Sequence, residues 1–354
     1  MKNLIVIYGG RSAEREISVL TAFSVLKSID YSRYTVKSVF ISKEGSWVKG
    51  PVYTAPPLEE NQLHLTYGEE ASQPTGEIIS PSVISDLGEI AFPLLHGPMG
   101  EDGTIQGFFE TIGMPYVGCG VMASANGMDK ILTKYLLEIA KIPQVPFVPV
   151  SAVEWKEEKE KVIQRCLGIA KFPMFVKPSN MGSSVGITRA ENIAELEDAI
   201  QVAFEYDGRV VVEQGVDARE IEVGLLGNGD IQTTLPGEIV KDVAFYDYNA
   251  KYIDNKITMA IPAEISEETM ALARTYAKRA FKILDGSGLA RCDFFLTKDG
   301  ELFLNELNTM PGFTQFSMYP SLWKNMGIEY ADLIERLIQL GEERFAQREK
   351  YFEK

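Results

Sequence analysis

The sequence has few cysteines and histidines, and this scarcity limits the metal and redox chemistry open to the chain. Its 354 residues include three cysteines, Cys119, Cys166 and Cys292, and two histidines, His64 and His96. The cysteines show no CxxC spacing, so a structural zinc site is not expected and a reducing cytosol fits best. A histidine-rich metal centre is also excluded, so any bound metal must be held by oxygen ligands.

Long hydrophobic runs and an excess of basic residues are missing as well. No segment approaches the roughly 18 consecutive apolar residues of a membrane span. The apolar run from Leu4 to Tyr8 ends at Gly9-Gly10, which is too short for the core of a signal peptide. The net charge of −15, from 35 Lys and Arg against 50 Asp and Glu, argues against a nucleic-acid-binding role. We therefore expect a cytoplasmic protein that binds neither membrane nor nucleic acid.

The N-terminal third shows an alternating α/β pattern. A strand from Asn3 to Tyr8 ends in a glycine turn, an amphipathic helix follows, and residues 35–41 form a second strand. This order predicts an open parallel α/β domain of the Rossmann-like kind. Residues 50–85 are rich in Pro, Glu, Ser and Gly and have weak periodicity, so we expect a surface excursion there.

From residue 122 the pattern changes to α+β. A small central unit combines strands at residues 173–177 and 210–213 with a helix capped by Asn192. A larger region follows, with a helix over 267–284 and paired strands at 289–296 and 301–306. The expected division is an N-terminal domain, a central subdomain and a C-terminal subdomain, at residues 1–122, 123–214 and 215–354.

The paired C-terminal strands carry the strongest chemical signal. A tight turn between them would bring Asp293 close to Glu306, with Asn308 nearby. Oxygen ligands of these types suit Mg²⁺, which binds substrate phosphates. A hairpin whose acidic side chains face solvent is the alternative. The apolar run 294–296 favours the metal, because an unneutralised carboxylate cluster in a buried hairpin would be costly.

A lysine followed by small residues is the second signal. Lys177 ends a strand, and the loop after it reads Pro-Ser-Asn-Met-Gly-Ser-Ser-Val-Gly. Backbone N–H groups and hydroxyls of such a loop can surround phosphate oxygens, with the lysine as a point charge. The order of residues differs from a Walker A motif, and a plain hairpin turn is the alternative.

Three weaker signals lie near expected turns and hinges. Glu213 ends a strand at a hinge, where a backbone edge can pair with adenine and Glu220 can hold ribose, although a simple linker is commoner. Glu14 begins the first helix after Gly9-Gly10, where it suits an ammonium ligand or only the helix N-terminus. His96 follows a strand in a glycine-rich turn, as a substrate contact or a structural residue.

An aromatic segment in the C-terminal region is the last candidate. Residues 245–252 read Phe-Tyr-Asp-Tyr-Asn-Ala-Lys-Tyr and have little strand or helix pattern. Aromatic clusters usually belong to a core, but a loop of this kind over 244–256 can act as a lid that excludes water from a site.

Taken in order, these motifs resemble the D-alanine–D-alanine ligase family of the ATP-grasp superfamily. The resemblance runs from Gly9 to Met318, and it rests on the segments GGRSAEREIS, LLHGPMGEDGTIQG, GVMASANGMDK, VKPSNMGSSVG, FYDYNAKY, RCDFF and NELNTMPGFTQFSMYP. It implies a Rossmann-like domain followed by a two-part ATP-grasp fold. The main departures from the family pattern are Asn180-Met181 and the excursion at 50–85, which touch no matched catalytic position.

The resemblance implies roles for individual residues. ATP would be bound through its phosphates, adenine and ribose by Lys130, Lys177, Gly182, Ser184, Val185, Glu213, Gln214, Val216 and Glu220. Two Mg²⁺ ions, with Mn²⁺ as the alternative, would be held by Asp293, Glu306 and Asn308. The catalytic set would be Glu14, Ser183, Tyr252, Arg291 and Gly312, and the D-alanine contacts would be His96, Tyr248, Lys251, Ser317 and Met318. The family also implies a homodimer and a role in cell-wall synthesis.

Three other functions compete with this interpretation. A nicotinamide-dependent oxidoreductase is disfavoured because the GxGxxG spacing is missing. A non-catalytic nucleotide-binding regulator would not need Glu14, Arg291 and the acidic hairpin together. A related ligase that adds D-lactate or D-serine shares the ATP-binding half, but the presence of Tyr252 favours D-alanine over D-lactate.

Overall fold

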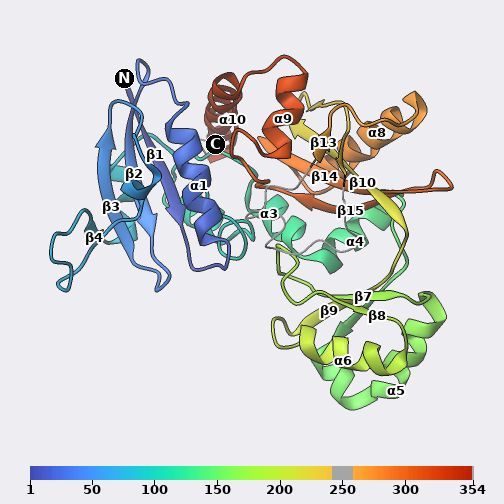
Figure 1. The fold of residues 1–354 in the computed structure, drawn as a ribbon. Helices are drawn as coiled ribbons and strands as arrows, with labels where there is room; N and C mark the ends of the chain where they lie inside the picture. The colour runs from blue at the N-terminus through green and yellow to red at the C-terminus, as the bar shows by residue number, and fades with distance from the viewer. Residues whose placement is uncertain (241–257, 353–354) are drawn as a thin grey trace.

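The computed structural model describes residues 1–240 and 258–352. Three β-sheets with their helices make up the molecule, and each has its own place in Figure 1: the N-terminal sheet at the left, the large C-terminal sheet at the upper right and a small sheet below. No helix of the described residues is long and apolar enough to cross a membrane. The expected domain bounds stay a prediction, although the sheets follow one another along the chain in the expected order.

The N-terminal sheet has five strands in the order β4-β3-β2-β1-β5. Its strands are β1 (Lys2–Gly9), β2 (Tyr34–Ile41), β3 (Trp47–Tyr53), β4 (Glu77–Ile79) and β5 (Ile90–Pro93). The strands β2, β1 and β5 are parallel, as the pattern predicts. The strands β3 and β4 pair in the antiparallel sense, so the segment expected to be a surface excursion extends the sheet instead. Its buried residues Val48, Leu63 and Leu65 hold it to the core.

Helices surround this first sheet, and one of them comes from the far end of the sequence. The local ones are α1 (Arg15–Leu26), α2 (Thr104–Thr111) and the 3-10 turns η1 (Glu60–Leu63) and η2 (Pro81–Asp86). The last helix, α10 (Tyr330–Phe352), packs Leu333 and Leu337 into the same core as β1. Arg344 of this helix lies 4.0 Å from the ring centroid of Tyr116 and 3.0 Å from Glu110. The two ends of the chain therefore belong to one packed unit.

The small sheet is antiparallel, with the strand order β6-β9-β7-β8. Its elements are β6 (Phe147–Ser151), α5 (Ala152–Ile169), β7 (Met174–Pro178), β8 (Thr188–Ala190), α6 (Ile193–Ala203) and β9 (Arg209–Gln214). The predicted cap of α6 is confirmed, because the Asn192 side chain accepts from the Glu195 N–H at 3.1 Å. Both helices cover one face of the sheet and share a core with Val176 and Val212.

The large sheet is also antiparallel, in the order β13-β12-β10-β14-β15 with β11 paired to β10. Its strands are β10 (Ala218–Leu226), β11 (Gln232–Thr233), β12 (Gly237–Val240), β13 (Thr258–Ala260), β14 (Leu289–Thr297) and β15 (Leu302–Asn308). The helices around it are α3 (Val121–Met128), α4 (Lys130–Ile139), α8 (Glu267–Ile283) and α9 (Met318–Asn325). Leu137 of α4 packs with Phe281 and Leu304 in the core of this sheet. Helix α4 is thus anchored to the large sheet, although it precedes the small one in sequence.

Candidate active site

Glu14 at the start of α1 meets the small-residue loop that follows β7. Its buried carboxylate accepts a hydrogen bond from the Ser183 hydroxyl, so the N-terminal domain and the small sheet touch at this point. Ser183 and Ser184 have φ angles of 50° and 62°, a left-handed conformation that costs free energy in residues other than glycine. Such backbone geometry is common at functional sites and presents consecutive N–H groups on one side of the loop.

A cavity of about 190 Å³ lies at this contact. One wall is formed by residues 11–14 with Pro98 and Met99, and the other by Met181, Gly182 and Val185. A Cβ atom at Gly97 would lie 2.4 Å from a carboxylate oxygen of Glu14, so only glycine fits beside this carboxylate. The cavity is therefore lined by a glycine-rich turn on one side and by the loop on the other.

His96 lies buried behind Glu14. Its Nε2 atom is 3.1 Å from the Thr21 hydroxyl, and its Nδ1 atom is 3.8 Å from Glu101. Burial alone would lower the pKa of His96, but the carboxylates of Glu101 and Glu14 outweigh it and raise the pKa above its ordinary value. His96 is thus placed to hold positive charge next to Glu14.

Two lysines converge on one buried carboxylate beside the loop. Glu213 is 2% exposed, and its two oxygens lie 2.6 Å from Lys177 Nζ and 2.9 Å from Lys134 Nζ. Burial would raise the pKa of Glu213, but Lys134 and Lys177 together lower it to about 2. The group of three carries a surplus of one positive charge, which suits a site for phosphate oxygens.

Lys130 lies at the start of α4 and reaches the same loop. Its Nζ atom donates to the Met181 carbonyl at 2.5 Å. Lys177 Nζ also donates to Asn305 Oδ1 at 3.3 Å, so the loop, α4 and the strand β15 are linked by the two predicted phosphate lysines. The structure therefore brings together Glu14, Lys130 and the segment that carries Lys177 and Ser183, three parts of the chain that are far apart in sequence.

The acidic hairpin has the predicted register. Asp293 of β14 lies opposite Glu306 of β15, and on its other side it lies opposite Glu222 of β10. Arg291 donates to both oxygens of Asp293 at 2.7 Å, and its Nε atom is also 2.9 Å from Glu222. Asn308 donates to Asp293 at 2.9 Å. The prediction that Asp293 and Glu306 are neighbours is confirmed.

The oxygen donors of this hairpin fit a hard divalent cation. Burial and the neighbouring carboxylates of Glu306 and Glu220 raise the pKa of Asp293, although Arg291 opposes the shift. Among the described residues, no group of three or more His, Cys, Asp and Glu side chains has a metal-binding arrangement. The predicted set has two carboxylates and one amide oxygen, from Asp293, Glu306 and Asn308, and these are ligands that Mg²⁺ accepts together with water and phosphate.

The comparisons with known proteins decide the family. The family model described as D-ala D-ala ligase N-terminus matches residues 3–119, and that described as D-ala D-ala ligase C-terminus matches residues 136–339. A curated D-alanine–D-alanine ligase from Enterococcus hirae is 61% identical over 353 residues, 99% of each chain. The chain belongs to the D-alanine–D-alanine ligase family. A second curated D-alanine–D-alanine ligase, from Streptococcus gordonii, is 56% identical over 350 residues, again 99% of each chain.

Solved structures agree with this membership. The D-alanine–D-alanine ligase from Coxiella burnetii matches with a TM-score of 0.83 and 32% identity, covering 99% of this chain and 97% of that one. The VanG D-Ala:D-Ser ligase from Enterococcus faecalis matches with a TM-score of 0.81 and 31% identity, over 96% of this chain and 99% of that one. The ATP-grasp type of fold is thereby confirmed for this ligase.

The remaining predicted residues of the ligase site fall into three groups. Gly312 and Ser317 lie side by side before α9, where Ser317 Oγ accepts from the Thr314 N–H at 3.1 Å and Met318 begins the helix. Gln214, Val216 and Glu220 lie along β9, β10 and their connection, with Glu220 on the face of β10 that carries Glu222. The predicted lid residues Tyr248, Lys251 and Tyr252 lie outside the described residues.

Two charged residues of the site were missed by sequence reasoning. Lys134 is one helical turn after Lys130, a spacing that places both on one face of α4 and could have indicated a shared partner. Glu222 alternates with Glu220 along β10, so the period of two could have placed it toward the acidic hairpin. Both residues contact segments that are distant in sequence, so no local pattern indicates their partners.

Proposed function

We propose that this chain joins two D-alanine molecules into D-alanyl-D-alanine, with ATP converted to ADP and phosphate, for peptidoglycan synthesis in the cytoplasm. The contact between Glu14 and Ser183 carries the proposal. It places a carboxylate suited to an ammonium group against a loop suited to phosphate, which is the juxtaposition that an amino-acid-activating ligase requires. We also propose that the enzyme works as a homodimer.

The first D-alanine binds at the cavity between Glu14 and the loop. Glu14 takes its ammonium group, supported by Ser183 and Tyr252, while His96 forms the floor of the subsite. The negative charge of Glu14 meets the loop at Ser183, and the positive charge of Lys130 meets it at Met181. A zwitterion held between them would direct its carboxylate toward the phosphates.

ATP binds between the small and large sheets. Lys130 and Lys177 hold its phosphates, with Gly182, Ser184 and Val185 over them, and the adenosine part lies against Glu213, Gln214, Val216 and Glu220. When Lys177 turns to the phosphates, Lys134 remains 2.9 Å from Glu213 and keeps this buried carboxylate paired. Asp293, Glu306 and Asn308 hold two Mg²⁺ ions, or Mn²⁺, which when bound neutralise charge on the transferred phosphoryl group.

The chain's residues position and stabilise two successive substitutions. In the first, a carboxylate oxygen of D-alanine bonds to the γ-phosphorus, the bond to ADP breaks, and an acyl phosphate forms. In the second, the deprotonated amine of the other D-alanine bonds to the acyl carbon and phosphate leaves. Arg291 and the Gly312 N–H stabilise the oxyanion between these bonds. Lys251, Ser317 and Met318 hold the carboxylate of the second D-alanine, with Tyr248 beside them.

A phosphate-release assay with ATP, Mg²⁺ and single amino acids tests the proposal. We expect turnover with D-alanine and little with L-alanine, and absence of D-alanine-dependent phosphate release would refute the function. Glu14→Gln should lower kcat/KM for D-alanine by at least about 100-fold, because a charge-assisted contact to the ammonium group is lost. Glu16→Gln is the matched control, since Glu16 pairs with Arg15 at the surface and should leave turnover unchanged.

A further inference from the structure

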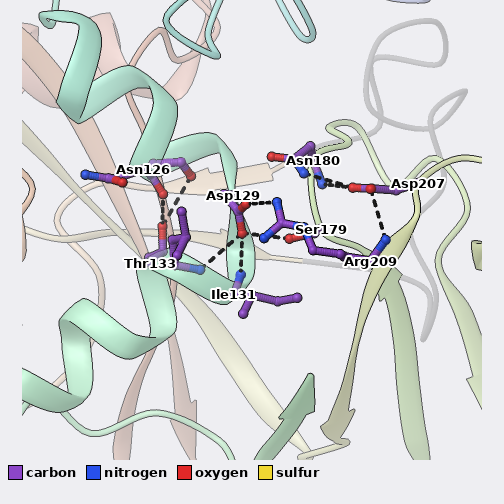
Figure 2. A network of polar contacts seen from close by, with 10 residues as sticks. Asn126, Asp129, Ile131, Thr133, Ser179, Asn180, Asp207 and Arg209 are labelled. Atoms are coloured by element: carbon purple, nitrogen blue, oxygen red, sulfur yellow. Dashed lines mark hydrogen bonds and ion pairs between the residues drawn. The ribbon is translucent and has the colours of Figure 1, made fainter. Parts of the chain in front are cut away.

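A buried aspartate outside the predicted site joins helix α4 to the small sheet (Figure 2). Asp129 precedes α4 and is 3% exposed. Its carboxylate accepts from the N–H groups of Ile131 and Leu132, both at 3.1 Å, and from the Ser179 hydroxyl at 2.7 Å. It also forms an ion pair with the guanidinium of Arg209.

Two of the partners of Asp129, Ser179 and Arg209, belong to a different packed unit from α4. Ser179 follows β7 and Arg209 begins β9, so both lie in the small sheet, whereas α4 is anchored by Leu137 to the core of the large sheet. Asp129 therefore connects the two sheets between which we place ATP. A carboxylate that only capped its helix would need no partner from the small sheet.

The first residues of the phosphate loop, Ser179 and Asn180, form hydrogen bonds with Lys130 of α4 and with Asp207 and Arg209 of the small sheet's last connection and strand. The Lys130 N–H donates to the Ser179 carbonyl at 2.9 Å, and the Ser179 N–H donates to the Arg209 carbonyl at 2.9 Å. Asn180 donates through its backbone and side-chain nitrogens to Asp207 at 2.8 and 2.9 Å, as Figure 2 shows. The loop that follows is therefore anchored at Ser179 and Asn180.

The two predicted phosphate lysines are close in sequence to Asp129 and Ser179. Lys130 is the residue after Asp129, and Lys177 lies two residues before Ser179. We propose that Asp129 and Arg209 are positioning residues, whose ion pair holds the small sheet against α4 so that Lys130 and Lys177 converge on the phosphates of one ATP molecule. This inference rests on the proposed function through the ATP-binding role of the two lysines.

Arg209 separates the positioning role from the role of the helix cap. The cap needs only an acceptor at residue 129, and Arg209 takes no part in it. The side chain of Arg209 is 45% exposed, so its replacement opens no buried cavity. Arg189 is a matched control, because it lies in the same small sheet, is 51% exposed and pairs with Glu191.

The experiment compares Arg209→Met with Arg189→Met in steady-state kinetics. We expect Arg209→Met to raise KM for ATP about 10-fold, the equivalent of one lost charge-assisted contact. Its kcat should stay within about twofold, because a loss of uniform binding raises KM alone. KM for D-alanine should not change, and Arg189→Met should match the wild type. Arg209→Lys should restore most of the ATP affinity.

Calorimetry with ADP and Mg²⁺ gives a second measurement that does not require turnover. An about 10-fold weaker ADP affinity in Arg209→Met, and in Asp129→Asn, which keeps a cap acceptor, supports the inference even if D-alanine proves not to be the substrate. An unchanged KM for ATP and unchanged ADP affinity in Arg209→Met overturns it. An equal loss in Arg189→Met overturns it as well, because the effect would then be general to the small sheet.

Discussion

Replacement of Glu213 by glutamine should destabilise the protein far more than replacement of its partner Lys134. Glu213→Gln leaves two buried ammonium groups, those of Lys134 and Lys177, without their counter-charge. Lys134→Met leaves Glu213 paired with Lys177 and removes a lysine that is only 1% exposed and whose pKa burial lowers. Buried ion pairs replaced by apolar groups are often neutral in stability, whereas a buried charge left alone is costly.

The magnitude follows from the pKa of Glu213, which falls from its ordinary value of 4.5 to about 2 in the folded protein. Each pKa unit corresponds to about 1.36 kcal/mol, so ionised Glu213 contributes about 3 kcal/mol to the free energy of unfolding at neutral pH. This agrees in size with the 3–5 kcal/mol typical of breaking a buried pair. For Lys134→Met we expect a loss of about 1 kcal/mol or less.

The direction of the pKa shift determines how the contribution of Glu213 to stability changes with pH. A folded-state pKa below the unfolded one means that the stabilisation is fully present above pH 4.5 and is lost as the pH falls toward about 2. We expect urea unfolding, followed by circular dichroism at pH 7 and pH 3.5, to show that wild type and Glu213→Gln differ in free energy of unfolding. This difference should be about 1 kcal/mol smaller at the lower pH. Equal stability of wild type and Glu213→Gln at pH 7, or a difference that does not become smaller at pH 3.5, would contradict this prediction.

Two further predictions concern the acidic hairpin and the thiols. Asp293→Ala should reduce D-alanine-dependent phosphate release by at least about 100-fold while the circular dichroism spectrum is retained, because a ligand for the divalent cation is lost; a fully active variant would contradict the metal role. The three buried cysteines should not react with a disulfide reagent at pH 8 until urea unfolds the protein, since burial raises the pKa of Cys119 and Cys166 to about 11 and raises that of Cys292 well above its ordinary value. Rapid native labelling of any thiol would contradict this.

The sequence predicts the parts of the site that depend on local pattern. The alternation of β14, the tight turn at Gly300 and the pairing of two adjacent strands suffice to place Asp293 opposite Glu306. The Asn192 cap and the lysine at the end of β7 follow in the same way from short-range rules. In each case, all the residues involved lie within one element or one hairpin.

The features that were missed depend on packing between distant segments. The strands β3 and β4 are short and lie in a polar stretch, and antiparallel addition to an existing sheet needs little apolar pattern of its own. Lys134, Glu222 and Arg209 act through partners whose positions only the assembled sheets define.

Helix α4 unites the charged contacts on which the proposed ATP site depends. Asp129 at its N-terminus and Lys134 on its second turn both bind the small sheet, and Lys130 between them reaches the phosphate loop. Its apolar face is packed into the large sheet, so these three groups move together as one rigid element. A rotation of the small sheet away from α4 would separate Asp129 from Arg209 and Lys134 from Glu213 at the same time. Because buried unpaired charges are costly, the charges at this junction favour the one orientation of the two sheets in which both lysines face the nucleotide.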